Sequence, residues 1–257
     1  MKFSESEIRA VIVCVNYHDF LTVTLPKNAR HFKNTLIISS KTDRRTIETV
    51  ELFQSMGYPI ELYLTESFWD DGADFNKWKA LEEGLSYYGR HGWLCNMDAD
   101  VLWPHIIPDF DLNVGNLYGP TRRMMAQVSF PIPDEREWSR QFPLHRNLNE
   151  IAGFSQIFHA DDPALRKQPW FEQNWKHAGG GDSMFQLRWT RDQKIRPPFE
   201  VLHLGENGHN WCGRATTMLD GEVPIAADQK RLKVREYIRN RRRYLPSGDP
   251  FAGEKIN

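Results

Sequence analysis

Short runs of apolar residues recur along the N-terminal part of the chain, separated by more polar segments. The runs are rich in β-branched residues and almost continuous, which is typical of strands buried on both faces of a parallel sheet. Four such strands are predicted, at residues 10–16, 35–40, 59–64 and 93–97.

The segments between these strands carry helical signals. After the first strand we expect a loop and a helix that end by Phe32. Thr42 and Asp43 stand in the capping position of a second helix, and Gly57 closes it. Apolar residues at helical spacing predict a third helix within residues 75–89. Strands that alternate with helices through short connections predict an α/β fold with a mostly parallel sheet flanked by helices.

Polar residues follow several of the predicted strands. Asn16 follows the first strand, Asp43 the second, and Asp98 and Asp100 the fourth. In open α/β sheets, ligands bind outside the carboxyl ends of the strands. We therefore expect these four side chains to lie along one ligand-binding edge.

The composition favours a globular protein without a membrane anchor. The chain has 257 residues, of which 40% are hydrophobic, enough for one sizeable core. No run of about 18 apolar residues occurs, and charges precede only a short apolar strand at the start, unlike a signal peptide. We expect a soluble, cytoplasmic protein. Cys14, Cys95 and Cys212 show no metal-ligand spacing, so we expect them to be reduced.

The net charge of −1 conceals a basic segment near the C-terminus. Residues 230–243 contain eight Lys and Arg against the single acid Glu236, with apolar residues interleaved. This pattern predicts a basic C-terminal helical tail within an extension at 225–257. Such a run is usually a solvated surface, but it could also hold an anionic partner.

The stretch WLCNMDADVLWP ends a buried strand on two carboxylates, Asp98 and Asp100. Carboxylates at i and i+2 on an extended segment share a face, and two like charges so close need a counterion. A divalent cation that also binds phosphate oxygens would supply it. The alternative is a polar turn, because Asp is a common turn residue.

Two downstream stretches could complete such a site. In AGGGDSMFQLRW, Asp182 follows Gly180 and Gly181, where backbone can approach a ligand closely and the carboxylate can take a proton from a hydroxyl. Asp182 would also suit the N-cap of a helix, and the two roles are compatible. In EVLHLGENGHNWCGR, an apolar strand ends at His203, which is either a satisfied polar residue or a further metal ligand.

The order of these motifs resembles the GT-A family of nucleotide-sugar-dependent glycosyltransferases, family 2-like, over roughly residues 9–215. The resemblance implies a GT-A (Rossmann-like) domain at 1–224, with a donor half at about 9–104 and an acceptor half at about 105–224. It also implies Mn²⁺ or Mg²⁺ held by Asp100 and His203, with Asp98 directed at the ribose or at the metal's water. The metal would neutralise the diphosphate as the sugar leaves.

The resemblance also implies roles for residues around the donor and the acceptor. Asp43 and Asn16 would contact the nucleoside, and Asn76 or Lys79 would line the donor pocket. Asp182 would be the general base, which gives inversion at the anomeric carbon. Inverting members usually carry Glu directly before that Asp, whereas Gly181 stands here, so retention stays open.

The acceptor is less defined by the sequence. Gly180 and Gly181 would lie near it, and Trp211 and Arg214 follow His203 closely enough to contact it, although the sequence favours Trp211 as a core residue. The acceptor would be a saccharide of the cell envelope or a hydroxylated, modified DNA base held through residues 230–243. An anionic lipid surface and a protein partner are further candidates for that segment.

Two other functions fit part of the pattern. A nucleotidyltransferase would bind a nucleoside triphosphate and Mg²⁺ at the same edge, but it would be expected to carry a Gly-rich basic loop after the first strand. The segment VNYHDFLTVTLPKNAR has no glycine there. A non-catalytic protein that binds a nucleotide sugar is the other alternative, and substitution of Asp182 would distinguish it from an enzyme.

Overall fold

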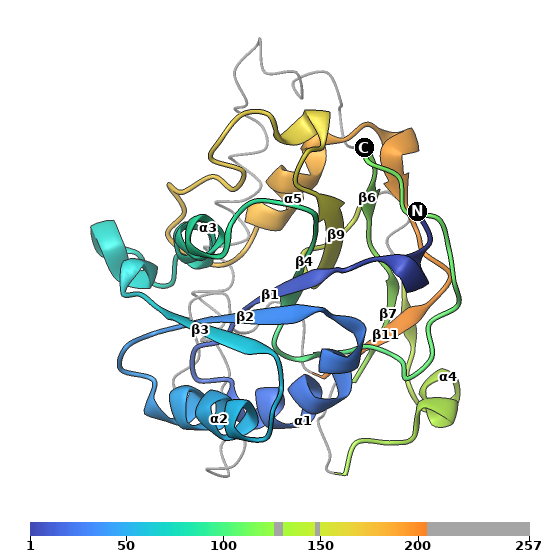
Figure 1. Cartoon of the computed structure of the whole chain (residues 1–257), viewed down its shortest axis with the longest axis horizontal. Helices are drawn as coiled ribbons and strands as arrows, with labels where there is room; N and C mark the ends of the chain where they lie inside the picture. Colours follow the sequence, from blue (N-terminus) through green and yellow to red (C-terminus); the bar gives the residue numbers. More distant parts are fainter. Residues whose placement is uncertain (126–130, 147–149, 205–257) are drawn as a thin grey trace.

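A computed structural model describes residues 1–125, 131–146 and 150–204 of the chain. Its largest element is a seven-stranded sheet in the order β10-β6-β9-β4-β1-β2-β3 (Figure 1). The four strands β1 to β4 run parallel, and β9 runs antiparallel to β4. Its strands are β1 (Arg9–Val13), β2 (Asn34–Ser39), β3 (Ile60–Leu64), β4 (Trp93–Asp98), β6 (Leu117–Tyr118), β9 (Ser155–His159) and β10 (Lys194–Ile195).

Helices cover both faces of this sheet, as Figure 1 shows. On one face, α1 (His18–Asn28) and α2 (Arg44–Ser55) pack their apolar side chains against Ile12 and Ile37. On the other face, α3 (Lys77–Tyr88) packs against Val11 and Ile38, and α5 (Gly181–Phe185) places Phe185 against Phe158 of β9. Because successive strand residues point to opposite faces, neighbouring apolar residues serve two different cores. The fold is therefore an α/β fold with a mostly parallel sheet flanked by helices, as predicted.

The sequence signals placed the N-terminal elements within a few residues. All four predicted strands are present, and the carboxylate of Asp43 caps α2 by accepting a hydrogen bond from the Thr46 N–H at 3.1 Å. Gly57 follows that helix with φ of 87°, a left-handed conformation that glycine adopts without strain. These features depend on residues near one another in sequence, which explains why the pattern predicted them.

The described residues also form a second, four-stranded sheet in the order β5-β11-β7-β8. Its strands are β5 (Val101–Leu102), β7 (Thr121–Met124), β8 (Leu144–His145) and β11 (Glu200–His203). β11 pairs parallel with β7 and antiparallel with β5. Since only Ala99 and Asp100 separate the end of β4 from the start of β5, the chain passes from the large sheet to the small one through these two residues.

The remaining described elements are short. They are the helix α4 (Trp138–Gln141) and short 3₁₀ segments at Phe3–Glu5, Ala29–His31, Ser67–Gly72, Glu135–Glu137, Pro163–Leu165, Gln186–Arg188 and Arg191–Gln193. Among the described residues, no helix is both long enough and apolar enough to cross a bilayer. Cys14 and Cys95 are buried and unbridged. The basic segment 230–243, the extension 225–257 and Cys212 lie outside the described residues.

Candidate functional site

The two carboxylates of the DAD stretch lie where the two sheets meet. Asp98 is the last residue of β4 and is level with Val13 at the end of β1, so it lies at the carboxyl edge of the parallel strands. Asp100 lies in the turn that leads into β5. The expectation of one continuous extended segment was wrong here, because a turn separates the two residues. The turn nevertheless leaves the two carboxylates near each other.

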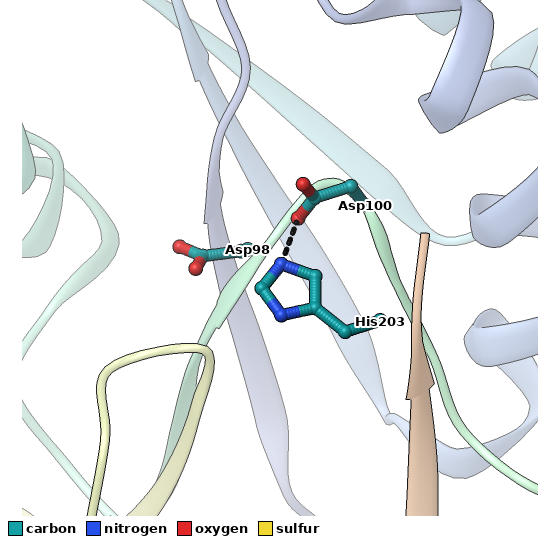
Figure 2. Close-up of side chains that lie close together, drawn as sticks. All are labelled: Asp98, Asp100 and His203. Atoms are coloured by element: carbon teal, nitrogen blue, oxygen red, sulfur yellow. Dashed lines mark ion pairs between the residues drawn. The ribbon is translucent and has the colours of Figure 1, made fainter. Parts of the chain in front are cut away.

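His203 reaches this turn from a distant part of the sequence. It is the last residue of β11 and is paired with Val101, and the next residue, Leu204, donates its N–H to the carbonyl of Asp100 at 2.8 Å. The imidazole Nε2 lies 3.3 Å from Oδ1 of Asp100, and both side chains are largely buried (Figure 2). Burial alone would raise the pKa of Asp100, but its electrostatic interaction and hydrogen bond with the imidazole of His203 outweigh burial and hold that pKa below its usual range.

Two positively charged side chains border these carboxylates. Lys77, the first residue of α3, forms an ion pair with Asp98. Arg122, in β7, donates from Nη1 to Nδ1 of His203 at 2.8 Å. Burial lowers the pKa of Arg122, while the charges of Asp98, Asp100 and Asp182 oppose that shift. These side chains therefore form one electrostatic cluster. Its members are Asp98, Asp100, Asp182, His203, Lys77 and Arg122.

Asp182 is held at this cluster by a close backbone contact. Its Oδ2 accepts the N–H of Gly153 at 2.8 Å, and Asp182 is the second residue of α5. The N-cap of that helix is Gly180, with φ of 95°, so the interpretation of Asp182 as the N-cap was wrong. Within the described residues, no hydrogen bond reaches its other oxygen, Oδ1.

Two glycines make this placement of Asp182 possible. A Cβ on Gly153 would lie 2.3 Å from Cβ of Asp182, and a Cβ on Gly181 would lie 2.4 Å from the indole ring of Trp78. Neither position can carry a side chain without displacing its neighbour. Gly181 thus allows close packing of α5 on α3, and its expected place near an acceptor stays a prediction.

The residues expected to contact the nucleoside make local structural contacts. Asp43 accepts hydrogen bonds from the N–H of Asn16 at 2.6 Å and of Thr46 at 3.1 Å, so both of its oxygens have partners. Asn16 has φ of 58°, and this contact holds it in the left-handed region. Both residues lie beyond the ends of β1 and β2, at the edge predicted for them.

The other two predicted donor-pocket residues lie at the start of α3. Asn76 caps this helix by accepting the Lys79 N–H at 3.1 Å, and its amide donates to the carbonyl of Gln173 at 2.6 Å. Lys79 pairs with Asp70 at 2.7 Å, away from the DAD stretch. Trp211 and Arg214, expected at the acceptor, lie outside the described residues.

The donor set of the cluster suits a hard divalent cation. One ligand atom each from Asp98, Asp100 and His203 can be chosen so that all lie within 4.8 Å of one another. Ligands about 2.0–2.1 Å from Mg²⁺ would be at most about 4.2 Å apart, so a small contraction would bring these three into range. Carboxylate oxygens with one imidazole are a donor set that Mn²⁺ accepts.

Sequence reasoning missed three residues of this site: Lys77, Arg122 and Gly153. Lys77 lies on the buried face of α3, one turn before Leu81 and two turns before Leu85. This spacing of four residues is visible in the sequence and could have indicated that Lys77 faces inward. Arg122 and Gly153 carried no local signal, because their partners are distant in sequence.

Comparisons with known proteins give no family. No protein-family model matches the chain, and no curated protein matches its sequence. Among solved structures, the apo structure of the WbbM bifunctional glycosyltransferase is similar, with a TM-score of 0.41 and 11% identity over 76% of this chain and 39% of that one. The chain thus spans about two-fifths of the length of WbbM.

Two further structures show comparable likeness. The 4-diphosphocytidyl-2C-methyl-D-erythritol synthase from Anaerococcus prevotii gives a TM-score of 0.39 and 10% identity, over 91% of this chain and 99% of that one. The mannose-6-phosphate isomerase from Helicobacter pylori gives a TM-score of 0.34 and 13% identity, over 60% of this chain and 71% of that one. These likenesses are too distant to indicate a reaction, and we base the function on this chain's own residues.

Proposed function

We propose that this protein is a metal-dependent glycosyltransferase that moves a sugar from a nucleoside-diphosphate sugar to an acceptor hydroxyl. The observation that carries the proposal is the convergence of Asp98, Asp100 and His203 at the carboxyl edge of the parallel strands, with Asp182 in the same electrostatic cluster. A ligand-binding edge, a cation site and a proton acceptor are the parts that such a transfer needs.

Asp100 and His203 would hold Mn²⁺ or Mg²⁺, with Asp98 as a further ligand or directed at the donor. When bound, the cation would supply Lewis-acid stabilisation of the negative charge on the departing diphosphate. Lys77 would keep Asp98 in place through their ion pair. Arg122 adds a positive charge at the same site, where it interacts favourably with the three carboxylates of Asp98, Asp100 and Asp182.

Asp182 would act as the general base. The Gly153 N–H fixes one carboxylate oxygen at 2.8 Å, which orients the other for the acceptor hydroxyl. The acceptor oxygen would attack the anomeric carbon as its proton passes to Asp182, and the bond to the diphosphate oxygen would break in the same step. A single displacement of this kind inverts the anomeric centre.

We propose a saccharide as the first acceptor class to test, with a hydroxylated DNA base as the second. The basic segment 230–243 motivates the second class, because Lys and Arg neutralise nucleic-acid phosphates without regard to sequence. Nothing among the described residues bears on this choice.

Isothermal titration with a panel of nucleoside diphosphates, with and without Mn²⁺, tests the donor site. We expect one diphosphate to bind only with metal, and Asp100→Ala to abolish that binding. Asp111→Ala is the matched control, because Asp111 is exposed and forms an ion pair with Lys2 at 3.0 Å. Absence of binding under every metal condition would overturn the proposal.

The base of the diphosphate that binds selects the sugar donors for turnover assays. Asp182→Asn should abolish transfer while donor binding persists. Release of pyrophosphate from a nucleoside triphosphate would instead identify a nucleotidyltransferase. Donor binding by the native protein without any turnover would identify a binding protein.

A further inference from the structure

Arg122 contacts the predicted metal ligand His203 in an unusual way. Its Nη1 lies 2.8 Å from Nδ1 of the imidazole, and a guanidinium can only donate hydrogen bonds. Nδ1 must therefore be the accepting nitrogen. A neutral imidazole has one N–H, so that proton lies on Nε2, where it faces Oδ1 of Asp100 at 3.3 Å.

This arrangement is the reverse of what a metal-bound histidine requires. A ligating histidine gives the lone pair of one nitrogen to the metal and normally donates the N–H of the other to an acceptor. If Nε2 of His203 bound a cation, Nδ1 would carry the proton and would meet the N–H of Arg122. If instead Nδ1 bound the cation, the cation would have to lie where the guanidinium of Arg122 now contacts Nδ1. Either way, the hydrogen bond between Arg122 and His203 excludes metal ligation by His203.

The surroundings of Arg122 hold it in this competing position. The residue is only 5% exposed, and its guanidinium lies over the ring of Phe154 with 4.6 Å between the Cζ atom and the ring centroid. Its buried Nε has no hydrogen-bond partner among the described residues. The charge of Arg122 interacts with those of Asp98, Asp100 and Asp182, as a bound cation's would.

We propose that Arg122 is an internal competitor of the metal ion, which must release His203 before that residue can join the coordination sphere. Arg122 is thus a positioning residue that sets the tautomer of His203 and lowers the affinity of the site for divalent cations. This inference rests on the proposed function, because it takes His203 as a ligand of the metal.

Mn²⁺ titration by calorimetry of the native chain, Arg122→Met and Arg123→Met tests the proposal without a turnover assay. Arg123 is the matched control: it is the next residue of β7, so its side chain leaves the opposite face, where it pairs with Glu200 at 2.9 Å. We expect Arg122→Met to bind Mn²⁺ about tenfold more tightly than the native chain: the size is the lower end of what altering a ligand's hydrogen-bond partner changes, and the sign is a gain because Arg122 opposes ligation. Arg123→Met should match the native chain.

Nitrogen NMR of the native protein, with ¹⁵N-labelled histidine, reads the tautomer of His203 directly and needs no variant. Without metal we expect a protonated Nε2, and saturation with diamagnetic Mg²⁺ should move the proton to Nδ1. A metal-free protein with the proton on Nδ1 would overturn the proposal. Arg122→Gln serves as a second variant if circular dichroism shows that Arg122→Met does not fold.

The outcomes separate this inference from the proposed function. If the native chain and both arginine variants bind Mn²⁺ equally, the metal site stands and Arg122 is not a competitor. If none of them binds Mn²⁺, the proposed metal site is wrong, and the inference fails with it. Binding by Arg122→Met alone would support both.

Discussion

The backbone N–H of Gly153 donates to Oδ2 of Asp182 at 2.8 Å, across 29 residues of sequence. This contact requires glycine, because a Cβ at position 153 would lie 2.3 Å from Cβ and 2.9 Å from Cγ of Asp182. The position of the proposed base therefore depends on a residue that has no side chain.

Gly153→Ala should displace the carboxylate of Asp182 and reduce turnover with the donor identified by calorimetry. A shift of about 1 Å in a reacting group can cost about 10²-fold in rate. We expect a loss of that order in kcat with little change in KM for the donor, measured by steady-state kinetics. Overpacking should also cost about 1–3 kcal/mol in the free energy of unfolding.

Gly84→Ala is the control for that stability loss. A Cβ on Gly84, in the middle of α3, would lie 2.2 Å from Cδ1 of Ile38 in the core, so it creates a clash of similar severity at another place. Its kcat should stay near the native value. Equal losses of kcat in the two variants would show that Gly153 acts through stability alone.

Lys77→Met should destabilise the protein more than Lys79→Met. The side chain of Lys77 is 11% exposed and pairs with Asp98, whereas Lys79 is 25% exposed and pairs with the more exposed Asp70. Removal of one partner from a largely buried pair leaves the other charge uncompensated, so we expect a loss of about 1–2 kcal/mol for Lys77→Met. Exposed pairs contribute about 0–1 kcal/mol, which sets the expectation for Lys79→Met. Urea denaturation measures both, and equal losses would contradict the ranking.

Glu82→Ala should be the most destabilising of these substitutions. Glu82 is 3% exposed, and its carboxylate accepts from Arg90 at 2.6 Å and from the N–H of Phe171 at 2.7 Å. The substitution leaves the guanidinium of Arg90 without its carboxylate partner and the N–H of Phe171 without its acceptor, and breaking a buried ion pair in this way typically costs about 3–5 kcal/mol. Glu51→Ala, at an exposed position of α2, should change the unfolding free energy by less than about 0.5 kcal/mol. A loss below 1 kcal/mol for Glu82→Ala would contradict this account.

His31 should make the protein less stable in mild acid. Burial lowers the pKa of His31 from 6.5 to about 4, and the nearby charges of Arg30 and His105 act in the same direction. The unfolded chain therefore binds a proton between these values that the folded protein does not bind. Stability contributed by neutral His31 is complete above pH 6.5 and is lost progressively as the pH falls towards 4.

Thermal melting of the native chain and of His31→Gln across this pH range tests that expectation. The native melting temperature should fall more steeply than that of His31→Gln as the pH drops from 7 to 4. Other groups titrate in both proteins, so only the difference between the two curves reports on His31. Parallel curves would show that His31 contributes no pH dependence.

The sequence determined the α/β alternation, the cap of α2 at Asp43 and the position of Asp98 at the end of β4. Each of these follows from residues within a few positions of one another, where apolar period, capping chemistry and glycine conformation act locally. The tertiary structure decided the composition of the site. His203 meets Asp100 because β11 pairs with β5, and Arg122 meets His203 because β7 pairs with β11.

Those pairings depend on which strands bury their apolar faces together, and no local pattern specifies them. The same holds for Asp182, whose local sequence suggested a helix cap, whereas its carboxylate bonds to Gly153 in a distant loop. Lys77 lies between these cases. Its place on the buried face of α3 is periodic and local, but its partner Asp98 comes from packing of that helix on the sheet.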